Sequence, residues 1–113
     1  MPSEKKNRSG KPVAGYDGRV VVGRRGIIED VDAGGCALLG YAREDVIGLH
    51  GSELIPVEAR PATAASLDRM RLGEINRREG RVLRRDGTTL GVDVTARRMA
   101  GGRLTLSLKK LSS

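Results

Sequence analysis

The chain has 113 residues, a formal net charge of +7 and a hydrophobic fraction of 38%. This length suits one domain, because domains usually hold about 100 to 150 residues. The sequence contains two Tyr but no Phe, Trp or Gln. It therefore lacks the rings that stack nucleic-acid bases or enclose a flavin or a haem. No run of about 20 apolar residues is present, so we expect no membrane-spanning helix.

The beginning of the chain differs in composition from the rest. Residues 1–16 are rich in charge, Gly and Pro and show no hydrophobic period, which is typical of a flexible segment. They lack the apolar stretch of a secretory signal, and the single Cys cannot form an internal disulfide. We therefore expect a flexible basic arm over residues 1–16, a single domain over residues 17–111 and a cytoplasmic location.

The first part of the domain predicts a hairpin followed by a short helix. Two β-branched runs, at 17–23 and 26–31, flank a turn that contains Arg24 and Arg25. Asp32 is a good N-cap residue and Gly40 is a typical helix end, although two glycines inside this helix weaken it. Further along, Ser52 is expected to cap a short helical turn.

The second part of the domain predicts a longer helix and three strands. Pro61 suits the first turn of a helix over 57–72, on which Ala64, Leu67 and Met70 form an apolar stripe. A strand over 75–84 leads to Asp86–Gly87, a strong hairpin signal. Two strands with period-two alternation then follow, and their apolar sides are formed by Leu90, Val92, Val94 and Ala96 and by Leu104, Leu106 and Leu108.

These elements predict an α+β fold. Two strands come first, several short helices and one longer helix follow, and three strands end the domain. Because the strands show a single apolar side, the helices must pack on one face of a five-stranded antiparallel sheet.

Two stretches resemble the PAS domain family. The first is GIIEDVDAGGCALLGYAREDVIG, residues 26–48, and the second is EGRVLRRDGTTLGVDVTARRMAGGRLTLSL, residues 79–108. The resemblance covers about residues 17–110. It implies a PAS-like five-stranded antiparallel sheet with helices on one face and a sensory role in signal transduction. The Asp-Ile-Thr-like ending of many members is absent, because Lys109 and Lys110 stand there.

The resemblance implies a ligand space between the helices and the sheet, but the residues favour no cofactor. A flavin photosensor of this family needs a reactive Cys near residues 48–55, whereas Cys36 lies in an earlier helix. Haem-binding members carry an axial His on the long helix, whereas His50 lies in a loop. One His and one Cys do not make a metal site. No catalytic arrangement is recognisable, so we expect a protein that is not an enzyme.

The apolar sides of helices and strands define a candidate pocket. Without large rings, this interior is either a filled aliphatic core or a site for a small apolar ligand. The candidate lining residues are Leu38, Leu39, Leu54, Ile55, Leu67, Met70, Val92, Val94, Leu104 and Leu106.

Paired arginines define a second candidate site. In a fully antiparallel sheet with the expected strand order of second, first, fifth, fourth, third, three pairs fall at one end and Arg84–Arg85 at the other. Guanidinium groups gathered there suit phosphate or an acidic surface, but the same pattern describes a solvated rim balanced by neighbouring acids. The candidate anion-binding residues are Arg24, Arg25, Arg77, Arg78, Arg97 and Arg98.

Three functions follow from these features. The first is a sensory and protein-interaction module that forms a homodimer through the outer sheet face and the N-terminal arm, with an effector protein or domain as a further partner. The second is a sensor of a small apolar ligand, and the third is a module that binds nucleic acid or acidic lipid through its arginines.

Overall fold

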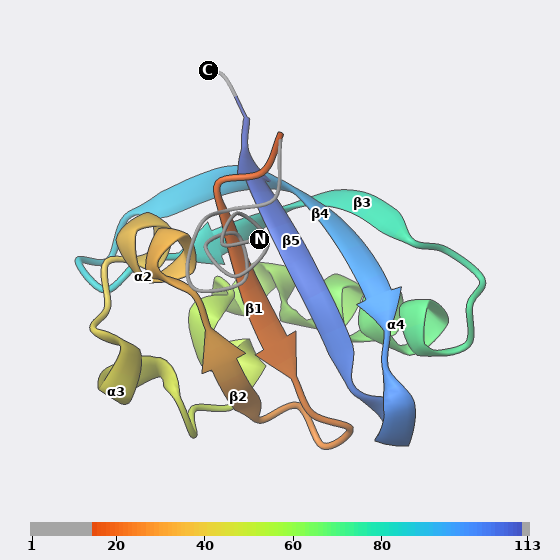
Figure 1. The fold of residues 1–113 in the computed structure, drawn as a ribbon. Helices are drawn as coiled ribbons and strands as arrows, with labels where there is room; N and C mark the ends of the chain where they lie inside the picture. Colours follow the sequence, from red (N-terminus) through yellow and green to blue (C-terminus); the bar gives the residue numbers. More distant parts are fainter. Residues whose placement is uncertain (1–14, 112–113) are drawn as a thin grey trace.

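The computed structural model describes residues 15–111, so most of the predicted basic arm lies outside the described residues. Figure 1 shows a twisted sheet with α4 behind it and α2 and α3 beside β1 and β2. In chain order the elements are β1 (Gly18–Val22), β2 (Ile28–Val31), α2 (Ala33–Leu39), α3 (Arg43–Val46), η1 (Gly51–Leu54), η2 (Val57–Ala59), α4 (Arg60–Arg71), β3 (Arg77–Leu83), β4 (Thr89–Arg98), η3 (Ala100–Gly102) and β5 (Leu104–Lys110).

The sheet confirms the predicted α+β fold and strand order. Its five strands follow the order β2-β1-β5-β4-β3, and every neighbouring pair is antiparallel. The central strand β5 pairs Leu104 with Val22 on one side and with Arg98 on the other. The β1–β2 turn and the η3 connection therefore lie at one end of the sheet, and the β3–β4 hairpin lies at the other.

Helix α2 confirms both of its predicted ends and explains its two internal glycines. The Asp32 carboxylate accepts a hydrogen bond from the Gly35 N–H at 2.7 Å, and Gly40 ends the helix with φ 79°. A side chain at Gly34 would collide with the Asp17 carbonyl just before β1, and one at Gly35 would collide with the Val31 side chain of β2 and the Arg19 carbonyl of β1. The close approach of helix and strand therefore requires glycine, and packing offsets the lower helix propensity.

The segment before the long helix differs from the prediction in two details. His50, rather than Ser52, caps the short turn, because its Nδ1 accepts the Ser52 N–H at 3.1 Å. The long helix begins at Arg60, since residues 57–59 form a separate 3₁₀ turn. Pro61 lies in its first turn as predicted, where a missing N–H leaves no helical hydrogen bond unmade.

The core lies between the inner face of the sheet and the helices. Leu39, Val46, Met70, Val92 and Leu104 are almost completely buried. In the view of Figure 1 no helix lies in front of β4 and β5, so the helices cover one face of these strands. No helix within residues 15–111 is long and apolar enough to cross a membrane.

Candidate functional site

A cavity of about 140 Å³ lies between α4 and the inner face of the sheet. Aliphatic side chains of β1, β4 and β5 form its floor, and residues of η1 and α4 form its opposite wall. Protein interiors usually contain few voids larger than one water molecule. This space is larger than a single water molecule, and its lining is mostly apolar.

Eight of the ten predicted lining residues border this cavity: Leu39, Leu54, Ile55, Leu67, Met70, Val92, Val94 and Leu106. Leu38 and Leu104 are buried but do not line it. Consecutive helix residues point about 100° apart, so Leu38 cannot face the same space as Leu39. Leu104 lies at the end of β5 beside Val22 and Arg98.

Small and polar lining residues were not predicted from the sequence. Thr63, Ala64 and Ser66 of α4 border the cavity, and Gly80 borders it from β3. The nearest atoms that a Cβ at Gly80 would meet belong to the Arg78 side chain, at 3.6 Å or more, so this position has room for a larger residue. The run of small residues in α4 could have indicated a cavity beside this helix. The same run is equally typical of an exposed helix face.

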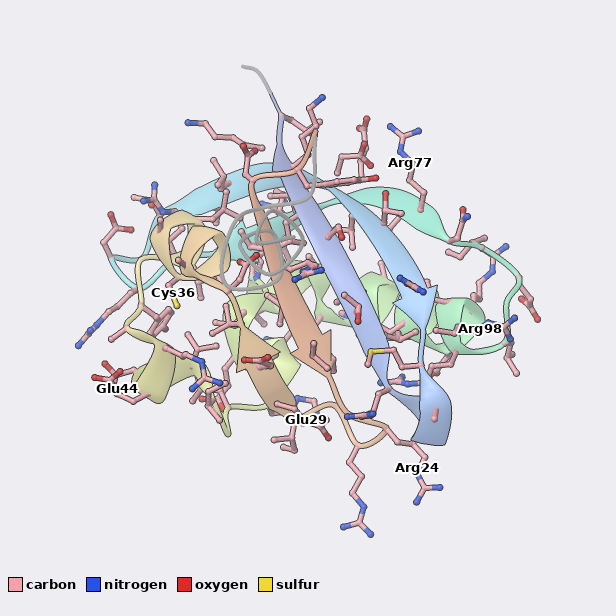
Figure 2. All side chains as sticks on the ribbon, in the orientation of Figure 1. Arg24, Glu29, Cys36, Glu44, Arg77 and Arg98 are labelled. Atoms are coloured by element: carbon pink, nitrogen blue, oxygen red, sulfur yellow. The ribbon has the colours of Figure 1, made fainter. Side chains whose placement is uncertain are left out.

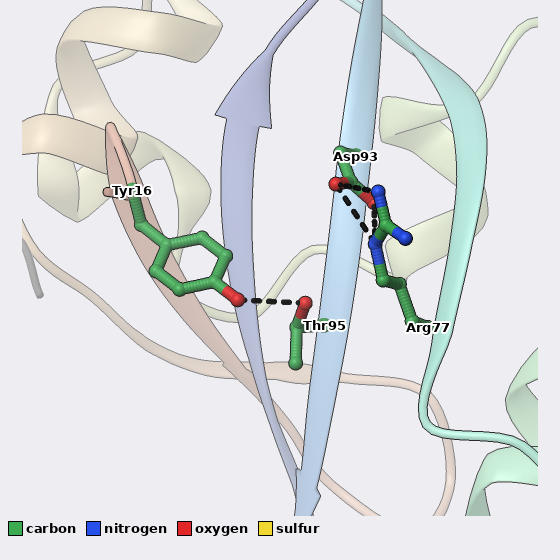
Figure 3. A network of polar contacts seen from close by, with 4 residues as sticks. All are labelled: Tyr16, Arg77, Asp93 and Thr95. Carbon is green, nitrogen blue, oxygen red and sulfur yellow. Dashed lines mark hydrogen bonds and ion pairs between the residues drawn. The ribbon is translucent and has the colours of Figure 1, made fainter. Parts of the chain in front are cut away.

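Arg77 points to the outer face of the sheet and is held there by Asp93. Its Nε and Nη2 donate to the Asp93 carboxylate at 2.9 and 2.6 Å. These hydrogen bonds and the negative charge of Asp93 raise the pKa of the Arg77 guanidinium. The Asp93 side chain is only 12% exposed. Figure 3 shows this pair beside the hydrogen bond of 2.9 Å that Tyr16 Oη donates to Thr95.

Arg78 points the opposite way and forms part of the cavity wall. Its Nη1 donates to the Ala62 carbonyl at 3.0 Å and to Ser66 Oγ at 2.6 Å, while Nε donates to the Glu79 carbonyl at 2.8 Å. All of these acceptors are uncharged. Among residues 15–111, no carboxylate lies within salt-bridge distance of Arg78.

The six candidate arginines do not form one group. Arg24 and Arg25 lie in the β1–β2 turn, and the Arg24 side chain lies against Gly102 of η3. Arg98 ends β4 at the same end of the sheet, with its guanidinium beside Gly73. Figure 2 shows Arg77 well apart from Arg24. Because side chains alternate along a strand, Arg77 and Arg78 cannot share a face, nor can Arg97 and Arg98. Anion binding by this set stays a prediction.

Acidic residues near these arginines pair with other basic partners. Glu29 pairs with Arg103 at 3.5 Å, and Glu74 pairs with Arg69 at 3.4 Å. Both are exposed, so their contribution to stability is small. At the opposite end, Arg85 pairs with Asp45 and lies over the ring of Tyr41.

The other chemically reactive side chains do not form a site. Burial raises the pKa of the Cys36 thiol, and the negative charge of Asp32 adds to the effect, so the group is a neutral thiol at neutral pH. Cys36 is not a cavity residue, and the lining contains no Asn, so the residues present do not fit a flavin photosite. His50 borders the cavity, with Nδ1 bound to the Ser52 N–H. No group of three metal-ligating side chains occurs within the described chain.

Comparisons with known proteins identify the fold. No protein-family model and no curated protein matches the sequence. A domain of a sensory box sensor histidine kinase/response regulator from Geobacter sulfurreducens is similar at 26% identity and a TM-score of 0.75, and the match covers 95% of this chain and 93% of that one.

Two further solved structures share the fold at lower identity. The PAS domain of the HTR-like protein from Haloarcula marismortui is 23% identical with a TM-score of 0.68, over 98% of this chain and 100% of that one. The Rhodobacter sphaeroides LOV protein is 16% identical with a TM-score of 0.74, over 99% of this chain and 69% of that one. With the strand order, the helices on one face and the motifs at 26–48 and 79–108, these similarities show that the chain has the fold of a PAS domain.

Proposed function

We propose that this PAS domain is a sensory signalling module that binds a small molecule between α4 and the sheet. The observation that carries the proposal is the cavity of about 140 Å³. An apolar cavity of about 150 Å³ is known to accommodate a molecule of the size of benzene. The Geobacter relative is a domain of a sensor kinase, which supports a sensory role. No catalytic step is assigned to the domain.

The position of the cavity suggests how an occupant would change the protein. Helix α4 is tied to the sheet near its last turn, where Arg71 donates to the carbonyls of Gly23 and Gly102 at 3.1 and 3.3 Å. Along the same helix, Arg78 donates to the Ala62 carbonyl and to Ser66. A ligand between these two attachments would press on α4 and on β3. In this proposal, the shift passes to an effector domain or protein.

Native mass spectrometry of the protein purified from cells tests this function. We expect a retained small-molecule mass that is lost from a Gly80→Val variant, because the valine fills the space beside Arg78. Gly91→Val is the matched control, since Gly91 lies on β4 next to Leu111 and outside the cavity. A wild-type protein that carries no mass and gains no thermal stability from any member of a small-molecule library would contradict the proposal.

We further propose that two copies pair through the outer face of the sheet. This face carries the half-buried hydroxyl side chains of Thr95, Thr105 and Ser107, with Tyr16 laid across it. Short hydroxyl side chains leave room for a second sheet to approach. The part of this hypothesis that concerns the N-terminal arm falls on residues outside the described range.

Sedimentation velocity over a range of concentrations tests the pairing. We expect a dimer that a Ser107→Arg substitution dissociates, because the new charge stands at the centre of the face. An Arg71→Lys variant, changed on the covered side, should retain the dimer. A wild-type chain that remains monomeric at high concentration would contradict this proposal.

A further inference from the structure

The geometry points to a short aliphatic carboxylate as the ligand of the cavity, with its carboxylate bound by Arg78 and its apolar tail between α4 and the sheet. This inference rests on the proposed function and adds the chemical class of the ligand. It is carried by the surroundings of one arginine, by the space next to it and by the volume of the cavity.

The first observation is that Arg78 brings a positive charge to an apolar space without a negative partner. Its three acceptors within the described chain are two carbonyls and one hydroxyl. Two other arginines border the cavity. Arg81 pairs with Glu58 at 3.0 Å, whereas Arg60 donates through Nε to the Ile55 carbonyl at 3.1 Å and also has no carboxylate partner within the described chain. A carboxylate that arrives with the ligand would give this guanidinium a charge-assisted hydrogen bond, which is stronger than a bond to a neutral acceptor.

The second observation is that one nitrogen of Arg78 remains available. Nη2 donates to no group within residues 15–111, whereas Nε and Nη1 are both used. A Cβ at Gly80 would lie 3.7 Å from Nη2, so the backbone next to this nitrogen carries no side chain. The bonds to Ala62 and Ser66 fix the guanidinium in place, and a ligand carboxylate therefore meets a donor that is already oriented.

The third observation sets the size of the ligand. A volume of about 140 Å³ matches a tail of about six carbon atoms, judged from cavities that hold benzene. The floor of the cavity, formed by Val92, Val94 and Leu106, is aliphatic. A long acyl chain does not fit, and acetate lacks the tail that this floor would bury.

Hexanoate, 1-hexanol and acetate separate the contribution of the charge from that of the tail. The intact chain, labelled with ¹⁵N, is titrated with each compound at constant ionic strength, and dissociation constants are taken from amide chemical-shift changes. We expect hexanoate to bind about tenfold more tightly than 1-hexanol, because a charged acceptor roughly doubles the strength of a hydrogen bond. Acetate should produce no saturable shifts around the cavity.

Two variants with the same change of charge identify the responsible arginine. Arg78→Gln should reduce the preference for hexanoate over 1-hexanol to about twofold or less, mainly by weakening the binding of hexanoate. Arg97→Gln, on the outer face of the same sheet, should keep the full preference. If Arg78→Gln does not fold, the three wild-type titrations still decide the ligand class.

The possible results distinguish this inference from the proposed function. If 1-hexanol binds as tightly as hexanoate, the carboxylate assignment is wrong, although the cavity still takes a small molecule. If an equal preference for hexanoate persists in Arg78→Gln, the role of Arg78 is wrong. If neither six-carbon compound causes saturable shifts at cavity residues, both the ligand class and its site are overturned.

Discussion

The two faces of the sheet place consecutive arginines in different surroundings. On the outer face, Arg77 forms a two-point ion pair with Asp93, and its side chain is 62% exposed. On the inner face, Arg78 binds only neutral acceptors and borders an apolar cavity. The difference teaches that two consecutive residues of one strand can carry the same charge and have different partners, a carboxylate for Arg77 and only neutral groups for Arg78.

The largest expected effect on stability comes from shortening a buried side chain of the inner sheet face that does not border the cavity. Leu104 is 0% exposed, so Leu104→Ala should lower the free energy of unfolding by about 2 to 5 kcal/mol, the usual cost for a fully packed leucine. Leu106→Ala, two residues along the same strand, should cost clearly less because Leu106 already borders empty space. Urea unfolding measures both. Equal losses would show that the cavity is filled in solution.

The next effect breaks the ion pair of the outer face. Arg77→Ala leaves the poorly exposed Asp93 carboxylate without its cation, whereas Asp93→Asn removes the charge and keeps the shape. We expect Arg77→Ala to lower the unfolding midpoint more than Asp93→Asn, but less than Leu104→Ala does.

The double variant Arg77→Ala/Asp93→Asn checks the cause of that loss. It should be more stable than Arg77→Ala alone, because the stranded charge has been removed. If the stability loss of the double variant equals the sum of the losses of the two single variants, the pair contributes nothing through its charges.

A smaller effect, of opposite sign, comes from filling the cavity. Gly80→Val should raise the free energy of unfolding by about 1 kcal/mol, because it adds apolar contacts at a site with room for a side chain. Gly91→Val makes the same change on the outer face and controls for the higher strand propensity of valine. Thermal unfolding of both variants isolates the filling effect as their difference. No difference would show that the space beside Gly80 is not part of a packed interior.

The smallest effect concerns the ion pair at the cavity border. A backbone N–H and then the Arg81 guanidinium hold the pKa of Glu58 below its usual value. A lowered folded-state pKa means that Glu58 adds stability above the ordinary carboxyl pKa and loses it as the pH falls through the folded value. NMR titration of the Glu58 carboxyl should show this low pKa, and it should return toward normal in Arg81→Gln. Since the pair is exposed, Glu58→Gln should not measurably change stability at neutral pH.

Much of the fold was predictable because local patterns carry it. Asp32 and Gly40 fix the ends of α2, and Asp86–Gly87 fixes a hairpin. The alternation of Val92 and Val94 with Asp93 assigns the faces of β4 correctly. The cap of η1 was predicted wrongly, because a histidine side chain can take the acceptor role that is usual for serine.

The candidate site was predictable only in its apolar part. Hydrophobic periodicity places eight leucine, isoleucine, valine and methionine side chains around the cavity. It does not reveal an empty space, because a void results from what several distant segments fail to fill. Gly80 and Ser66 show this limit, since neither belongs to a hydrophobic pattern.

The sequence by itself determined the strands, the sheet order and the apolar interior, because these follow from period-two alternation, turn residues and the PAS motifs. Only the tertiary structure decided the roles of the arginine pairs. Neighbouring residues of a strand point to opposite faces, so the function of each depends on what the fold brings to that face. On the outer face, Asp93 of the neighbouring strand lies diagonally from Arg77 and binds it, whereas on the inner face Arg78 meets α4 and the cavity.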